Sequence, residues 1–113
     1  MRIFIALLLM CALAACGGRS VRAPAGVTFA SGPISAACLA AGRQNASRAS
    51  CQCIQGVADD TLSRGDQRTG ATFFDDPERG QDVRLDDSPA ADAFWERWTT
   101  YAEAAEDVCR AVL

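Results

Sequence analysis

Ser47-Arg-Ala-Ser-Cys-Gln-Cys-Ile-Gln-Gly-Val-Ala-Asp-Asp-Thr-Leu62 is the stretch around which the rest of this chain can be placed. Its apolar residues recur at the spacing of one face of an α-helix, and two cysteines, Cys51 and Cys53, lie within it. In a helix of 3.6 residues per turn, two residues separated by one other point about 200° apart around the axis. The two cysteines therefore need different partners, and the stretch predicts a helix that is cross-linked on both sides.

A short helix is predicted just before this central helix. Pro33 suits a first helical turn, and Ile34, Cys38 and Ala41 follow at helical spacing, so we expect a helix from Pro33 to Arg43. The chain then turns, with Asn45 or Ser47 as the N-cap of the central helix.

Two short helices are predicted after the central one. The first begins near the cap at Ser63 and runs to Phe74, and the second begins at Asp76-Pro77 and runs to Arg84. We expect both Phe73 and Phe74 to lie in the core, since large apolar rings in a small domain are usually buried.

The last predicted helix gives the strongest periodic signal in the chain. It runs from Pro89, after a cap at Asp86-Asp87-Ser88, to about Ala111. Its apolar residues recur in steps of four and three and form a stripe typical of a helix that faces the core. The stripe consists of Phe94, Trp98, Tyr101, Ala105, Val108 and Val112, widened by Trp95, Ala102 and Cys109.

The start of the chain has the features of an export signal. Met1-Arg2 is positively charged, the run from Ile3 to Leu13 is apolar but too short to cross a bilayer, and small residues follow. The end of this segment, Leu13-Ala14-Ala15-Cys16, resembles the lipobox of bacterial lipoproteins. The resemblance implies cleavage of residues 1–15 and acylation of Cys16, which would become the mature N-terminus.

Cysteine usage after this cleavage predicts two disulfide bonds. With Cys16 lipidated, four cysteines remain, at 38, 51, 53 and 109, and an even number in a small exported domain is typical of a disulfide framework. A metal site is not predicted, because the chain has no histidine and lacks paired Cys-x2-Cys ligands.

Two pairings of these cysteines are compatible with the pattern. Helices that end near 43 and begin near 48 form a hairpin in which Cys38 lies beside Cys53, and Cys51 then bonds to Cys109; this is the pairing that we predict. An offset by one helical step gives the alternative, Cys38 with Cys51 and Cys53 with Cys109. A bond between Cys51 and Cys53 is disfavoured by the strain of its small ring.

The mature chain is predicted to be a flexible tether followed by one domain. Residues 16–31 are rich in glycine and proline, although Val27 and Phe29 could pack locally, and residues 32–113 form an all-α, disulfide-stapled bundle of three to five helices. A domain of roughly 80 residues is small enough for disulfides to matter to its stability.

Composition excludes several functions. The sequence contains no lysine and no histidine, so histidine-based catalysis is ruled out, and no other motif supports an enzyme or a cofactor. Without residues 1–15 there remain ten arginines against fourteen acidic residues, a net charge of about −4. An acidic chain without a basic cluster argues against nucleic acid, and against anionic lipid, as the main partner.

Two polar clusters are candidate sites. Acidic residues crowd the segment from Asp75 to Asp87 but lack the spacing of a calcium loop, so we expect mainly caps and a solvated edge. The second cluster consists of Asp66-Gln67-Arg68 with Gln81, Arg84 and Asp86. It could form arginine–carboxylate pairs that hold the middle segment on the bundle, with ligand recognition as the alternative.

A further resemblance covers nearly the whole predicted domain, from Gly32 to Cys109. The residues that carry it are Cys51-Gln-Cys53-Ile-Gln-Gly-Val-Ala58, Leu62-Ser63, Asp66-Gln67-Arg68, Phe73-Phe74-Asp75-Asp76-Pro77, Gln81-Asp82-Val83-Arg84, Phe94-Trp95 and Cys109. Together with the lipobox, this pattern resembles a group of uncharacterised small alphaproteobacterial lipoproteins, some of which are labelled "arginine transporter".

The expected function is that of a lipid-anchored module of the bacterial cell envelope, structural or protein-binding, with an envelope protein as partner. By resemblance to lipoprotein sorting, Gly17 rather than aspartate after Cys16 implies the outer membrane, with the inner membrane as the alternative. The transporter label implies an alternative function, that of an accessory or solute-capture subunit in which Asp75, Asp76 or Asp82 binds a guanidinium. A chain without a spanning helix cannot itself form a translocation path.

Overall fold

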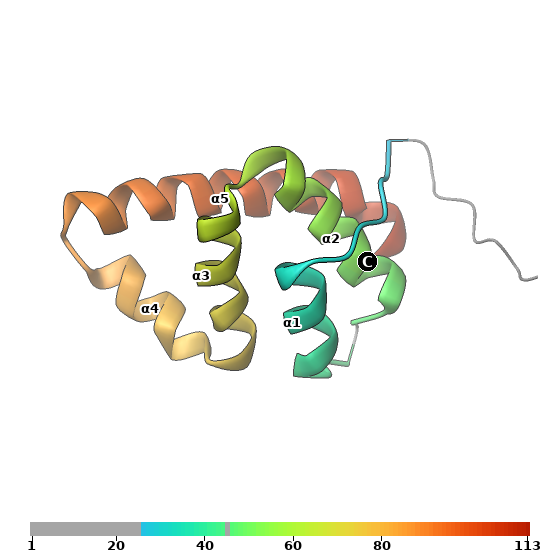
Figure 1. The fold of residues 1–113 in the computed structure, drawn as a ribbon, viewed down its shortest axis with the longest axis horizontal. Helices are drawn as coiled ribbons and strands as arrows, with labels where there is room; N and C mark the ends of the chain where they lie inside the picture. The colour runs from blue at the N-terminus through green and yellow to red at the C-terminus, as the bar shows by residue number, and fades with distance from the viewer. Residues whose placement is uncertain (1–25, 45) are drawn as a thin grey trace, which may run out of the picture.

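The computed structural model describes residues 26–44 and 46–113, and within these ranges the chain is helical and contains no strand (Figure 1). The elements are α1 (Pro33–Ala41), α2 (Arg48–Thr61), α3 (Arg64–Asp75), α4 (Pro77–Leu85), α5 (Pro89–Cys109) and the 3-10 helix η1 (Arg110–Val112). The predicted all-α, disulfide-stapled fold is therefore confirmed.

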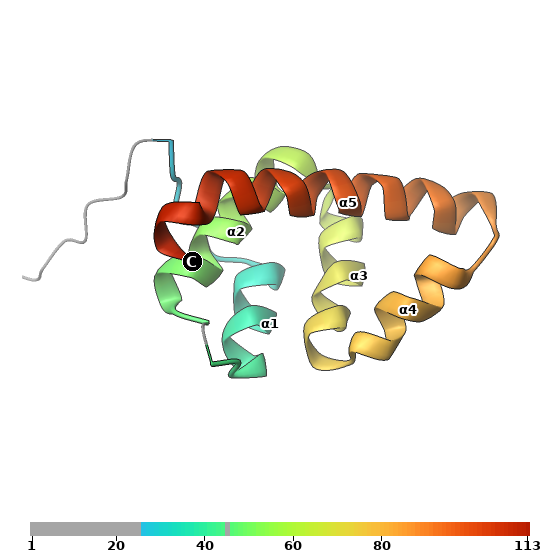
Figure 2. The ribbon, with the colours of Figure 1, turned by 180° about the vertical axis from the view of Figure 1, so that it is seen from behind.

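The longest helix, α5, runs along one side of the molecule, and the shorter helices pack beneath it (Figures 1 and 2). α1 packs against α2 and α3, α2 packs against α5, and α4 contacts both α3 and α5. In both views the α1–α2 connection and the C-terminus lie at one end of the long axis, and the α4–α5 connection lies at the other. This arrangement gives the domain two distinct ends.

Side-chain caps explain where four of the helices begin. In each case an oxygen of the N-cap residue accepts a hydrogen bond from a backbone N–H in the first turn, which otherwise has no partner inside the helix. These caps are Ser47 for α2, Ser63 for α3, Asp76 for α4 and Ser88 for α5. The caps predicted at these residues are confirmed, whereas Asn45 lies outside the described residues.

The core lies mainly between α2 and α5. It consists of Val27, Ile34, Cys53, Val57, Ala58, Leu62, Tyr101, Ala105 and Cys109. The predicted stripe of α5 is confirmed at Phe94, Tyr101, Ala105 and Cys109, which are buried, but not at Ala102 and Val108, which are exposed. Val108 lines a surface hollow between α5, α2 and the extended segment that contains Gly26 and Thr28.

The predicted boundary between tether and domain, after residue 31, is wrong. Val27 is buried in the core, Phe29 packs against it, and the Ala30 N–H donates a hydrogen bond of 3.0 Å to the Gln52 carbonyl. The Thr28 carbonyl approaches α2 so closely that a Cβ at Gly56 would overlap it. The absence of a side chain at Gly56 thus lets the segment before α1 lie against α2, and the packed part of the chain reaches back at least to Val27.

An aromatic cluster joins α3 to α5. The Phe73 ring meets the rings of Phe94 and Trp98 edge to face, with centroid distances of 5.9 and 5.4 Å, and Trp98 lies 5.0 Å from Tyr101. Such contacts add to the burial of the rings themselves. Phe73 and Phe74 are half-buried rather than fully buried; Phe74 packs against the main core, and Phe73 belongs to the aromatic cluster.

Gly70 of α3 allows this cluster to pack, and its replacement by alanine should be destabilising. The Trp98 ring occupies the space that a Cβ at Gly70 would fill, so Gly70→Ala forces the indole to move. We expect the free energy of unfolding to fall by about 2 kcal/mol, as is typical of an overpacked site. Urea unfolding followed by circular dichroism measures the change.

Gly65 in the same helix provides the matched control. The nearest atom to a Cβ at this position is Ser63 Oγ at 3.9 Å, which is ordinary contact. Gly65→Ala should therefore show only the gain in helix propensity, up to about 1 kcal/mol. Similar effects of the two substitutions would contradict the close packing of Trp98 on Gly70.

Candidate functional site

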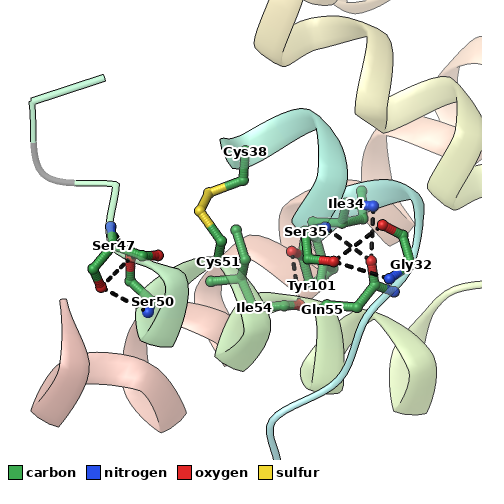
Figure 3. The surroundings of a disulfide bond; sticks show 10 residues. All are labelled: Gly32, Ile34, Ser35, Cys38, Ser47, Ser50, Cys51, Ile54, Gln55 and Tyr101. Atoms are coloured by element: carbon green, nitrogen blue, oxygen red, sulfur yellow. Dashed lines mark hydrogen bonds between the residues drawn. A yellow bond between two sulfur atoms is a disulfide. The ribbon is translucent and has the colours of Figure 1, made fainter. Parts of the chain in front are cut away.

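Two disulfide bonds tie α2 to its neighbours. Cys38 of α1 is bonded to Cys51, with a Cα–Cα distance of 5.6 Å (Figure 3). Cys53 is bonded to Cys109 at the end of α5, with a Cα–Cα distance of 5.9 Å. The predicted pairing, Cys38 with Cys53 and Cys51 with Cys109, is therefore wrong, and the alternative pairing is the one found. The prediction that α2 is cross-linked on two sides is confirmed.

The length of α1 accounts for the error in pairing. The helix ends at Ala41, two residues before the predicted end at Arg43, because Gly42 adopts a left-handed conformation with φ of 60°. This conformation is a common helix C-cap and is easily reached only by glycine. A helix that is shorter by two residues shifts the hairpin register by two, which places Cys51 opposite Cys38 and leaves Cys53 to face α5.

A fully buried glutamine, Gln55, connects α1, α2 and α3. Its side-chain oxygen Oε1 accepts hydrogen bonds from the backbone N–H groups of Ile34 (2.7 Å) and Ser35 (2.9 Å), in the first turn of α1 (Figure 3). Its Nε2 donates to Asp59 Oδ1 (2.9 Å) and to Gln67 Oε1 (2.8 Å). One side chain thus caps α1 and links it to the two helices on which it packs.

Gln67 of α3 continues this network. It is almost completely buried, and its Nε2 donates to the Ala58 carbonyl at 3.3 Å and to Asp59 Oδ1 at 3.2 Å. No buried side-chain nitrogen or oxygen within residues 26–44 and 46–113 lacks a partner. The sequence interpretation missed Gln55, although a signal was present: it lies four residues after Cys51, on the apolar face of the helix, where a polar group needs a partner.

Tyr101 joins α5 to the same helix. Its hydroxyl donates a hydrogen bond of 3.0 Å to the Ile54 carbonyl, and its ring is buried in the core. Burial raises the pKa of Tyr101 well above its usual value, because the phenolate would have to form away from water. Together with Gln55 and the two disulfides, this contact connects α2 to α1, α3 and α5.

The three aspartates proposed as ligands do not form a common site. Asp76 caps α4 and pairs with Arg79 at 3.5 Å, while Asp75 and Asp82 are exposed. Asp82 alone of the three lines a surface hollow, and Arg79 lines the same hollow. In the part of the chain that the structure describes, no group of three or more acidic, cysteine or histidine side chains could hold a metal ion.

The predicted arginine–carboxylate pairs in the middle segment differ from those found. Asp66 binds Arg97 of α5 through two hydrogen bonds, of 2.6 and 3.1 Å, and the bonds raise the pKa of Arg97. Asp86 instead accepts a hydrogen bond from the Ser88 N–H, which lowers the pKa of its carboxyl group. The sequence interpretation did not consider Arg97, because the pair spans residues that only the packing of α3 on α5 brings together.

Open hollows lie on the surface of the domain. The first, of about 320 Å³, lies beside the α1–α2 connection and is mainly apolar. Its lining residues are Cys38, Arg43, Gln44, Ala46, Ser50, Ile54 and Leu113. The second, of about 360 Å³, lies between α3 and α4 and contains Phe73, Arg79 and Asp82. Both are wide and shallow, unlike the concave pockets that surround small molecules.

Comparison of the chain with models of protein families, with curated proteins and with solved structures found no match. Within residues 26–44 and 46–113, no helix is long and apolar enough to span a membrane. The predicted signal segment and Cys16 lie outside the described residues, so acylation of Cys16 stays a prediction.

Proposed function

We propose that this protein is a lipid-anchored component of the bacterial cell envelope, held by acyl chains on Cys16. Support comes from the charged start, the apolar run and the lipobox in residues 1–16. The two disulfides of the domain agree with export, because such bonds persist in oxidising compartments. Gly17 after Cys16 favours the outer membrane, with the protein facing the periplasm.

Replacing the predicted lipidation site tests this anchor. Cys16→Ser should move the protein from the membrane fraction to the soluble fraction of a lysed envelope, because two or more acyl chains are needed for stable attachment. Intact-mass measurement of the wild-type protein should show the mass of the chain from Cys16 onward plus that of its acyl groups. Cys11→Ser, which lies within the predicted signal, is the control and should remain membrane-bound. A soluble wild-type protein without acyl mass would refute the proposal.

The helical domain acts, in this proposal, as a protein-interaction module without catalytic activity. The observation that carries this is Leu85, a large apolar side chain that is 74% exposed at the end of α4. It is the last residue of α4 and precedes the acidic α4–α5 connection. That connection lies at the end of the molecule opposite the α1–α2 connection (Figure 2). Single exposed apolar side chains are common on protein surfaces, but Leu85 is the most exposed large apolar side chain among the described residues, and it is therefore the position that we propose for a partner contact.

Site-specific crosslinking tests this role. A photo-crosslinking residue at position 85 should give discrete adducts with an envelope protein in intact cells, whereas one at Thr100, on the exposed face of α5, should give few. Leu85→Ser should weaken co-purification of the same protein. Equal labelling from both positions, or none, would argue for a purely structural role.

The alternative role as a solute-capture subunit gains no support from the hollow between α3 and α4. Asp82 could bind a guanidinium there, but Arg79 in the same hollow would repel it. We therefore expect calorimetric titration with arginine to show no binding in the millimolar range. Saturable binding that Asp82→Asn abolishes would restore this alternative.

A further inference from the structure

The charges of this chain are separated along its sequence. All fourteen acidic residues lie between Asp59 and Asp107, and the first 58 residues contain none. From Gly26 to Ala58 the only charged residues are Arg43 and Arg48. The whole chain therefore has a net negative charge, although the only charged residues between 26 and 58 are positive.

The fold places this positive charge around the apolar hollow beside the α1–α2 connection. Arg43 lines that hollow, and Arg48 lies between Ala46 and Ser50, which also line it. Neither arginine forms an ion pair within the part of the chain that the structure describes. We refer to this hollow, with Arg43 and Arg48, as the basic face.

Apolar side chains complete the basic face. Leu113 is 65% exposed at the edge of the hollow, and Ile54 is half-buried within it. The nearby Arg110 is paired with Asp107 at 3.2 Å. The result is an apolar surface with a modest excess of positive charge.

The predicted anchor reaches the domain at the same end. The segment at Gly26, the C-terminus and the α1–α2 connection share one end of the long axis in both views (Figures 1 and 2). The ten residues of sequence from Cys16 to Ala25 include Arg19 and Arg22 and no acidic residue. The acidic α4–α5 connection, which contains Asp86 and Asp87, lies at the opposite end.

From this arrangement we propose that the basic face rests on an anionic phospholipid bilayer, the one that carries the acylated Cys16. The arginines face the lipid phosphates, Leu113 and Ile54 meet the apolar part of the interface, and the acidic end with Leu85 points away from the membrane. Arginines close to an anionic surface are attracted to it, and acidic groups are repelled over about a Debye length. The composition of the whole chain argues against anionic lipid as a partner, but the fold places two unpaired arginines, Arg43 and Arg48, beside one apolar hollow.

This proposal rests on the proposed lipid anchor, and its test uses the lipidated protein. The wild-type protein, purified from membranes, is reconstituted into phosphatidylcholine vesicles and into vesicles with about 30 mol% phosphatidylglycerol. Hydrogen exchange is then followed by mass spectrometry. Peptides covering residues 41–50 should exchange several-fold more slowly on the anionic vesicles, and peptides covering 77–88 should not change. Salt at about 1 M should abolish the difference.

Two double variants with the same change in charge sharpen the test. Arg43→Gln/Arg48→Gln should remove the protection of residues 41–50, whereas Arg64→Gln/Arg84→Gln, at exposed arginines elsewhere, should retain it. Equal exchange on both kinds of vesicle, or equal loss in both variants, would overturn the proposal. Protection that also appears on phosphatidylcholine would indicate a different contact, such as one between copies of the protein.

The mass of the same sample reports separately on the anchor. If Cys16 carries acyl groups but the basic face is not protected, the anchor stands and the docking fails. If the protein carries no acyl group, flotation with the same two vesicle preparations takes the place of reconstitution. If the protein then binds the anionic vesicles but not the phosphatidylcholine vesicles, and if Arg43→Gln/Arg48→Gln lowers this affinity at least tenfold, the basic face is supported without the anchor. If the protein binds neither kind of vesicle, both the anchor and the membrane contact of the basic face are refuted.

Discussion

Replacing both cysteines of the Cys53–Cys109 bond by alanine is expected to lower the free energy of unfolding by about 4 kcal/mol. The two residues are separated by 56 positions, so the bond strongly restricts the unfolded chain. Both cysteines are also fully buried, and they join the middle of α2 to the end of α5. For a domain whose total stability is on the order of 5–15 kcal/mol, this is a large share.

The Cys38–Cys51 bond provides the comparison. Its residues are separated by 13 positions, and the chain-entropy relation gives about 3 kcal/mol for a loop of this length. In urea unfolding without reductant, Cys53→Ala/Cys109→Ala should therefore have a lower free energy of unfolding than Cys38→Ala/Cys51→Ala. A reversed order would show that the shorter bond stabilises the folded state by more than loop closure.

The same variants test the pairing itself. Each of the two double variants removes a whole bond, so neither should contain a free thiol among the remaining domain cysteines after alkylation in denaturant. Cys38→Ala/Cys53→Ala instead removes one cysteine from each disulfide, so Cys51 and Cys109 should remain as free thiols or form a non-native bond. If this crossed variant were the fully oxidised and stable one, the originally predicted pairing would be correct.

Gln55→Leu is expected to cost about 3 kcal/mol or more, although leucine has a similar size and suits a buried position. The substitution leaves the N–H groups of Ile34 and Ser35 without an acceptor, and it removes the donor to Gln67 Oε1. Each unsatisfied buried group costs about 1–3 kcal/mol, and added apolar burial offsets only part of this. Faster hydrogen exchange in the first turn of α1 should accompany the loss, because Gln55 caps that helix.

Gln52 provides a matched control in the same helix. It is half-buried, and its side chain takes part in none of the hydrogen bonds found among the described residues. Outside the helix, its backbone carbonyl accepts a hydrogen bond from the Ala30 N–H. Gln52→Leu should therefore change the free energy of unfolding by no more than about 0.5 kcal/mol. A small effect at both positions would mean that water can replace the Gln55 contacts.

Local sequence signals predicted the helices well, because these signals act within a few residues. Ser47, Ser63, Asp76 and Ser88 begin helices through bonds to their own first turns, and no distant residue is needed. The stripe on α5 identified most of its buried residues for a similar reason, since helical periodicity follows from backbone geometry alone.

The candidate surfaces were less predictable because they depend on contacts between distant residues. Arg97 lies 31 positions from Asp66, and nothing in either local sequence indicates the pair. The basic face combines Arg43 with Ile54 and Leu113, from three separate parts of the chain. The net negative charge of the whole chain instead predicted that anionic lipid is not its main partner.

The sequence by itself determined that Cys51 and Cys53 point to different sides of one helix and that this helix is the centre of the domain. Only the tertiary structure decided which partner each cysteine takes. The reason is geometric: Gly42 ends α1 at Ala41, and a change of two residues in helix length exchanges the two bonds. The buried Gln55 was likewise visible in the sequence as a polar residue on an apolar face, but its partners on α1 and α3 exist only after the helices have packed.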